Sequence, residues 1–159
     1  MDTATYINVL IDTLVKKIKV LEELSSVIKA QEENFSTKDI DLDDFDSVLL
    51  KKDILIEQLN QLDDGFEKIY LRVKEELTLN GAIYRNYILT IQGYIKEIME
   101  KSAFIQTKEK QLKLKFDSYL INKKNEIKNF KISNQTANSY YKNMMNSVQD
   151  EPYFLDKKN

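Results

Sequence analysis

The hydrophobic residues between positions 41 and 79 recur with a seven-residue period, which is typical of a long amphipathic helix. One line of this repeat consists of Phe45, Lys52, Leu59, Phe66 and Val73. Two neighbouring lines are also mostly apolar, so the stripe is three positions wide, as a helix facing a bundle core requires. Such a helix is not stable alone in water, because its apolar stripe needs a cover. The pattern predicts a helix over 42–79 with helical neighbours.

The segments on either side repeat the same pattern. A helix is expected over about 3–34, capped by Thr3 or Thr5, and its seven-residue line is Ile7, Leu14, Leu21, Ile28 and Phe35. The polar stretch 36–41 suits a turn and an N-cap. A second turn is expected at Asn80-Gly81. A helix over about 82–131 follows, with the line Tyr84, Ile91, Ile98, Ile105, Leu112 and Tyr119.

These elements predict an all-α fold, an elongated antiparallel three-helix bundle over residues 1–131 with a flexible C-terminal arm over 132–159. The chain has 159 residues, of which only 3 are Gly and 1 is Pro, and so few helix breakers favour long helices. Gly65 lies inside the second helix and costs about 1 kcal/mol relative to Ala. The surrounding stripe is strong enough to continue the helix through it. Short connections make neighbouring helices antiparallel.

The apolar stripe of the third helix is broad up to Ile98 and narrower beyond it. Its later part is too apolar for a free helix and too narrow for a core. A second apolar cluster lies beyond a Ser/Asn-rich linker. These two groups are the candidate client-binding residues: Ile105, Leu112, Phe116, Tyr119, Leu120, Tyr140, Tyr141, Met144 and Met145. Two interpretations of the tail cluster remain open, because it suits either docking on its own bundle or binding a partner.

Charge is unevenly distributed although the net charge is only −2. Residues 32–64 contain eleven acids and three lysines, whereas 101–131 contain nine lysines and three acids. We expect the basic end of the third helix to lie beside the acidic start of the second, although exposed ion pairs contribute only about 0–1 kcal/mol each. No signal peptide or membrane span is evident. A cytoplasmic protein is expected.

The composition disfavours catalysis and cofactor binding. The chain contains no His and no Cys, which removes the usual general base, thiol nucleophile and soft metal ligands. Asp39, Asp41 and Asp43 imitate a calcium loop, but Asp44 and Leu50 occupy the positions where Gly and Glu are needed. The lysine-rich helix lacks a stacking platform for nucleic acid. No catalytic residue, metal site or cofactor is predicted, and neither nucleic acid nor membrane insertion is expected.

Several stretches resemble the FlgN-type flagellar export chaperones. They are the Asp-rich break "STKDIDLDDF", the following "LLKKDILIEQL", and an ending, "SYYKNM…FLDKKN", similar to that of the clostridial members. The resemblance implies a non-catalytic cytoplasmic chaperone that binds the hook–filament junction proteins FlgK and FlgL before secretion. Such a chaperone delivers its clients to the flagellar type III export gate. In the family, the C-terminal part contributes much of the client contact, which matches the candidate residues by region.

Two alternatives stay open at this point. The chain can be a structural coiled-coil protein or adaptor whose stripes close a homodimer. It can also be a chaperone for another flagellar client, such as the filament cap or flagellin. A helix-in-groove contact would serve any of these chaperone functions, because it covers the apolar helical faces of a client.

Overall fold

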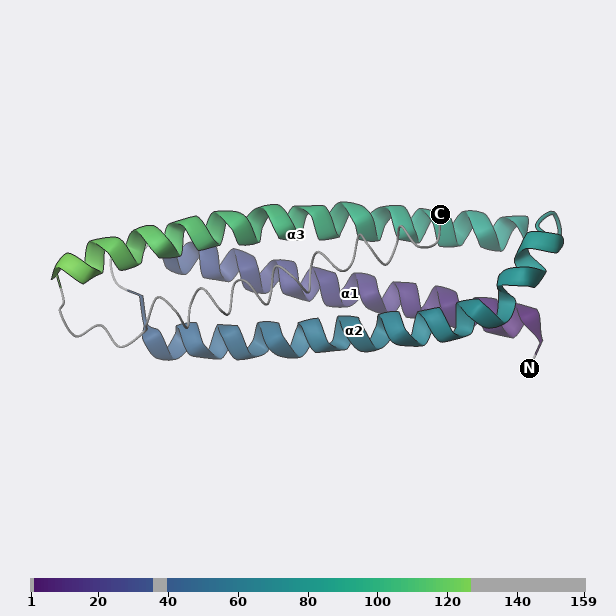
Figure 1. Cartoon of the computed structure of the whole chain (residues 1–159), viewed down its shortest axis with the longest axis horizontal. Helices are drawn as coiled ribbons and strands as arrows, with labels where there is room; N and C mark the ends of the chain where they lie inside the picture. The colour runs from purple at the N-terminus through teal and green to yellow at the C-terminus, as the bar shows by residue number, and fades with distance from the viewer. Residues whose placement is uncertain (1, 36–39, 127–159) are drawn as a thin grey trace.

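A computed structural model of the chain describes residues 2–35 and 40–126, with side chains through Lys124. These residues form three long helices, α1 (Thr3–Phe35), α2 (Leu42–Leu79) and α3 (Arg85–Glu126). The helices lie side by side in an elongated bundle (Figure 1). The predicted all-α three-helix bundle is confirmed. The predicted arm 132–159, and residues 127–131 of the third helix, lie outside the described residues.

The helix boundaries follow from local capping. Asp41 accepts hydrogen bonds from the backbone N–H groups of Asp43 and Asp44, so it is the N-cap of α2. The cap of α1 is Asp2, which accepts from the backbone N–H of Thr5 at 2.8 Å, and the prediction of Thr3 or Thr5 is wrong. The carboxylate of Asp2, one residue before Thr3, accepts from an N–H group in the first turn that has no partner within the helix.

The third helix begins at Arg85, three residues later than predicted. Residues 80–84 form turns in which the backbone carbonyl of Asn80 accepts from the N–H groups of Ile83 and Tyr84. The break at Asn80-Gly81 is therefore longer than a tight turn, and it reverses the chain between α2 and α3.

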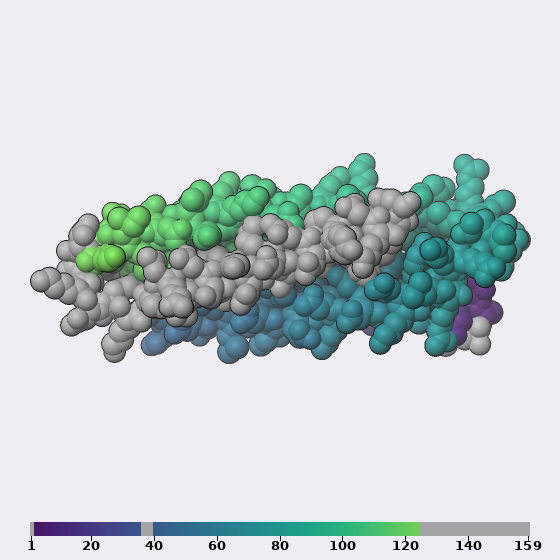
Figure 2. All heavy atoms as spheres, in the orientation of Figure 1, coloured from purple at the N-terminus to yellow at the C-terminus, as the bar shows by residue number. Residues whose placement is uncertain are grey.

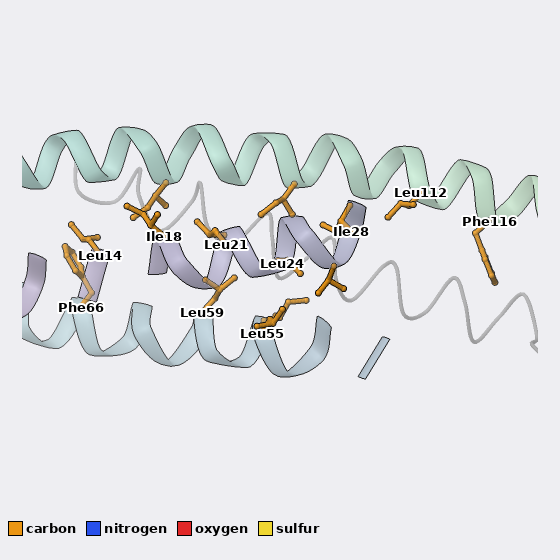
Figure 3. Packing of buried hydrophobic residues seen from close by; sticks show 14 of the residues in the cluster. Leu14, Ile18, Leu21, Leu24, Ile28, Leu55, Leu59, Phe66, Leu112 and Phe116 are labelled. Carbon is orange, nitrogen blue, oxygen red and sulfur yellow. The ribbon is translucent and has the colours of Figure 1, made fainter. Parts of the chain in front are cut away.

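The core forms along α1, which packs against both other helices. Its buried line includes Leu14, Leu21 and Ile28, which interleave with Leu55, Leu59 and Phe66 of α2 and with residues of α3 (Figure 3). All five residues of the first line predicted for α2 are buried, including Lys52. Gly65 lies within the continuous α2, as expected.

By contrast, α2 and α3 do not pack closely on each other. Within these described helices, no Cα atom of α2 lies within 8 Å of a Cα atom of α3, whereas α1 comes that close to both. The space-filling view shows α2 and α3 along opposite edges of one face (Figure 2). We call the hollow that opens between them above Leu10 of α1 the α2–α3 groove.

Candidate functional site: the α2–α3 groove

The structure places the nine candidate client-binding residues in three different settings. Ile105, Leu112, Phe116 and Leu120 are buried in the core, with exposed fractions between 0 and 7%. Tyr119 is half-buried, and its hydroxyl oxygen accepts from the backbone N–H of Ile40 at 3.4 Å. The remaining four, Tyr140, Tyr141, Met144 and Met145, lie outside the described residues.

The expectation that the later stripe of α3 is too narrow for a core is wrong. Phe116 stacks on Phe45 of α2 with ring centroids 4.9 Å apart, and it meets Phe35 of α1 edge-on at 5.8 Å. One residue from each helix therefore closes this end of the bundle. Large rings fill the space that a narrow aliphatic stripe leaves open, because each aromatic side chain buries a large area.

The unfilled apolar surface lies at the opposite end, where the sequence predicted the broadest core. None of residues 85–97 of α3 is fully buried, and the first buried residue along α3 is Ile98. Here the α2–α3 groove opens into a hollow of about 360 Å³. Its apolar lining includes Leu10 on the floor, Phe66, Tyr70 and Leu77 on α2, and Ile88 and Ile91 on α3. We call this hollow the open end of the groove.

The rim of the open end is polar and carries long side chains. Lys74 and Lys96 line it from opposite helices, together with Gln92 and Thr78. Long lysine side chains cover apolar surface with their methylene groups and keep the ammonium in water. Met99 lies on the same lining and is 45% exposed. An apolar floor with long side chains at its rim suits an amphipathic helix laid into it.

The buried line of α1 that begins at Leu10 changes from apolar to partly polar along the helix. The seven-residue line that contains Leu10 continues through Lys17, Leu24 and Gln31, all at most 2% exposed. Lys17 Nζ donates to Asp63 Oδ1 at 2.6 Å, which anchors the floor to α2. Gln31 is buried and its two side-chain polar atoms have no hydrogen-bond partner. This line is therefore apolar at the open end and partly polar within the core.

A buried ion pair joins α2 and α3 at the level of Gln31. Lys52 Nζ of α2 donates to Glu109 Oε1 of α3 at 2.7 Å, and both side chains are fully shielded from solvent. The neighbouring contact of Lys108 Nζ with Glu32 Oε1 at 3.2 Å shows that Glu109 and Gln31 share this level. Glu109 Oε2 has no hydrogen-bond partner. Each helix thus contributes one polar side chain to a layer within the core.

Burial dominates the protonation energetics of this layer. Desolvation lowers the pKa of Lys52 below its ordinary value, and attraction to Glu109 only partly opposes it. Desolvation likewise raises the pKa of Glu109, and Lys52 partly opposes that shift. Both directions have the same cause, since low-polarity surroundings disfavour the charged form of either group. The pair is therefore held together against a substantial cost of removing two charges from water.

The basic end of α3 lies beside the start of α2, as expected, since Phe116 stacks on Phe45, and two lysines of α3 form ion pairs with acids of α1. Lys101 Nζ lies 3.6 Å from Glu22, and Lys108 Nζ lies 3.2 Å from Glu32. The backbone of α3 lies closer to α1 than to α2. These pairs are at least partly exposed, so they fix the register of α1 and α3 more than they add stability.

Two further properties concern the described residues alone. None of the three helices carries a stretch apolar enough to span a bilayer. Nor do residues 2–35 and 40–126 contain a group of three or more acidic side chains placed to hold a metal ion.

Comparison with known proteins adds no relative. No protein-family model, curated protein or solved structure matches this chain. The resemblance to the FlgN-type chaperones therefore rests on the residues quoted from the sequence.

The residues lining the open end were not among the candidate client-binding residues. Tyr70, Leu77, Ile88 and Ile91 all belong to predicted apolar stripes and were assigned to the core. The sequence did show that the stripe in the first part of α3 is broad enough for two neighbouring helices. In the structure, only α1 among the described helices packs closely against it. Periodicity shows that a face is apolar, and it does not show how many helices cover that face.

Proposed function

We propose that this protein is a non-catalytic flagellar export chaperone that holds a helical segment of its client in the open end of the α2–α3 groove. The clients would be the hook–filament junction proteins, of the FlgK and FlgL kind, bound in the cytoplasm before secretion. The chaperone would then deliver them to the export gate and its ATPase components. The sequence suggested the later stripe of α3 as part of the client site. We propose the other end of the bundle instead, because the later stripe is core.

The observation that supports this proposal is apolar surface left open between two helices. Phe66, Tyr70, Leu77, Ile88 and Ile91 line a hollow of about 360 Å³ that Leu10 closes from below. An amphipathic client helix would bury its own apolar face there, with anchor residues at helical spacing. A client that assembles through apolar helices would be kept from assembling prematurely in this way.

The rim favours binding that is reversible. Lys74 and Lys96 flank the hollow, and their side chains must be ordered when a helix docks between them. Ordering long side chains costs about 0.5–1.5 kcal/mol each, which limits affinity. A chaperone must release its client at the export gate, so a contact of moderate strength fits the proposed function.

Calorimetric titration with purified junction proteins of the same bacterium tests the proposal. Ile88→Lys places a charge in the hollow and should weaken client binding at least tenfold, about 1.4 kcal/mol. Leu114→Lys makes the same kind of change on the outer side of α3, where Leu114 is 68% exposed, and should leave binding unchanged. Equal binding by both variants would place the client elsewhere.

The rival functions give different outcomes in matched measurements. Titration with the filament cap protein and with flagellin separates a junction-protein chaperone from a chaperone for another client. Light scattering over a range of concentrations separates a chaperone from a structural homodimer. A tight dimer whose association is abolished by Ile88→Lys would assign the open end to a second copy of the chain and would reject the chaperone proposal.

A further inference from the structure

The open end of the groove is bordered by charge of one sign. Lys74 of α2 and Lys96 of α3 line it from opposite helices, and among the described residues no acidic side chain lines it. The acid that follows Lys96 in the sequence, Glu97, lies 3.9 Å from Lys101 instead. An apolar hollow therefore stands between two positive charges, on a chain whose net charge is −2.

These two lysines differ from the lysines at the boundaries between helices. Four boundary lysines each contact a carboxylate of the next helix at 2.6–3.6 Å: Lys17, Lys52, Lys101 and Lys108. Lys74 and Lys96 are exposed, and neither contacts a carboxylate within the part of the chain that the structure describes. The bundle thus neutralises its lysines where its own helices meet, and it leaves the two at the open end available to a partner.

The two lysines restrict the chemistry of a helix that docks between them. When its apolar anchors enter the hollow, the side chains on the two flanks of its apolar stripe come beside Lys74 and Lys96. An ammonium group has three hydrogen-bond donors and no acceptor, so carboxylates suit these flanks and cationic side chains are repelled. Exposed ion pairs add little affinity, and their main effect is on which partner is accepted and how it is aligned.

A second copy of the chain is a less suitable occupant. In a two-fold symmetric dimer the same surface of both copies meets itself. A dimer formed through the open end would bring the lysines of both copies to one contact, where like charges repel. The charge of the rim therefore favours a different, acidic partner.

We propose that the segment held at the open end is an amphipathic helix with acidic side chains on both flanks of its apolar stripe, and that Lys74 and Lys96 recognise those acids. This inference rests on the proposed function, because it specifies the chemistry of the client segment. It adds the requirement that charge beside the anchors decides which apolar helices are accepted.

Two designed peptides test this requirement without assuming a particular client. Both are amphipathic helices with leucines at positions i, i+3, i+4 and i+7. One peptide has glutamates on both flanks of the leucine stripe, and the other has lysines at the same positions. Fluorescence anisotropy should show that the full chain binds the glutamate peptide about tenfold more tightly or better. Equal binding of the two peptides, or no binding of the glutamate peptide, would overturn the inference.

A matched pair of protein variants assigns the preference to the rim. Lys74→Gln with Lys96→Gln removes both charges and should weaken binding of the glutamate peptide about threefold to tenfold, with a smaller dependence on salt. Lys51→Gln with Lys110→Gln removes the same charge at exposed positions that do not line the hollow, and should leave binding unchanged. Equal losses in the two variants would reveal a general charge effect and would overturn recognition by the rim.

Failure of this inference is distinguishable from failure of the proposed function. Ile88→Lys tests whether junction proteins enter the hollow, whatever the charge of their flanks. If Ile88→Lys weakens their binding and Lys74→Gln with Lys96→Gln does not, the client site stands and acidic recognition is overturned. If the glutamate peptide is preferred through these lysines but junction proteins do not bind, the recognition stands and the proposed client is wrong. Light scattering that shows a dimer at the open end, broken by Ile88→Lys, would assign the hollow to a second copy and overturn both.

Discussion

Lys52 and Glu109 form a fully buried ion pair, with Nζ and Oε1 2.7 Å apart, between two helices whose backbones do not touch. The seven-residue repeat placed Lys52 on the core line of α2, and the structure gives it a partner 57 residues away. Forming such a pair costs free energy, because two charges are removed from water. Removing one partner costs more, because it leaves an uncompensated buried charge. Its presence between α2 and α3 fixes their alignment at one level of the bundle.

Removing one member of the pair should destabilise the fold strongly. We expect Lys52→Met or Glu109→Leu alone to lower the free energy of unfolding by about 3–5 kcal/mol, because each leaves an uncompensated buried charge. The double variant should be near wild-type stability or about 1–4 kcal/mol more stable, since neither desolvation cost remains. Guanidinium denaturation measures all three. Lys101→Ala, in the partly exposed pair with Glu22, is the control and should cost about 1 kcal/mol or less.

The same pair should give the stability a characteristic pH dependence. The raised pKa of Glu109 means that the folded state binds its proton more readily than the unfolded chain, so stability falls as pH rises through that interval. The lowered pKa of Lys52 means that the folded state releases its proton more readily, so stability rises again as pH approaches the ordinary lysine pKa.

Measured against the double variant Lys52→Met with Glu109→Leu, the wild-type protein should therefore be relatively weakest near neutral pH. Its relative stability should improve toward both acid and alkaline pH. Denaturation curves for both proteins at matched pH values give this difference, in which the titration of all other groups largely cancels. A wild-type protein that gains relative stability at neutral pH would contradict the stated directions of both pKa shifts.

Two glycines inside helices should tolerate a side chain. A Cβ atom at Gly65 or Gly93 would meet nothing within 4 Å outside its own stretch of helix. Replacing either by Ala should raise the free energy of unfolding by about 1 kcal/mol through helix propensity, which corresponds to a rise in melting temperature of about 2–4 °C for a chain of this size.

Gly81 is the matched contrast to these two positions. It lies in the turn between α2 and α3, where a Cβ atom would come within 3.3 Å of the backbone carbonyl oxygen of Leu77. Gly81→Ala should give no gain, because the backbone oxygen cannot move aside as a flexible side chain can. Thermal unfolding followed by circular dichroism measures all three variants, and equal gains at all three would contradict the contrast.

The closed end of the bundle should behave as core. Phe116→Ala removes a ring that contacts Phe35 and Phe45 and should cost about 3–5 kcal/mol of unfolding free energy. Leu114→Ala, two residues away on the exposed face, should change stability by about 0.5 kcal/mol or less. If Phe116→Ala were equally mild, the later stripe of α3 would be available surface after all, as the sequence suggested.

Much of the fold followed from the sequence because helix formation is local. The period of the apolar residues and the residues at the breaks placed α2 at its observed bounds and α1 within one residue. Asp41 and its neighbours marked the start of α2 for the same reason, since a cap involves only adjacent residues. The cap of α1 was missed by one residue, because Asp2 and Thr3 are both suitable caps and periodicity does not choose between them.

The candidate site could not be placed by the same reasoning. The stripe of α3 looked broad before Ile98 and thin after it, so the broad part was assigned to the core and the thin part to a client. The structure places the thin part in the core, because Phe35, Phe45 and Phe116 close that end, and nothing among the described residues covers the broad end completely. The width of a stripe on one helix does not reveal the distance to the next.

The amino-acid sequence by itself determined three long helices, their breaks, and the line of each helix that faces inward, because these depend on a backbone repeat of 3.6 residues and on neighbouring side chains. Only the tertiary structure decided that α2 and α3 stand apart, that Lys52 meets Glu109, and that the open apolar surface lies between Phe66 and Ile91. Those relationships depend on how side chains from three helices fill one shared volume, and no single helix contains that information.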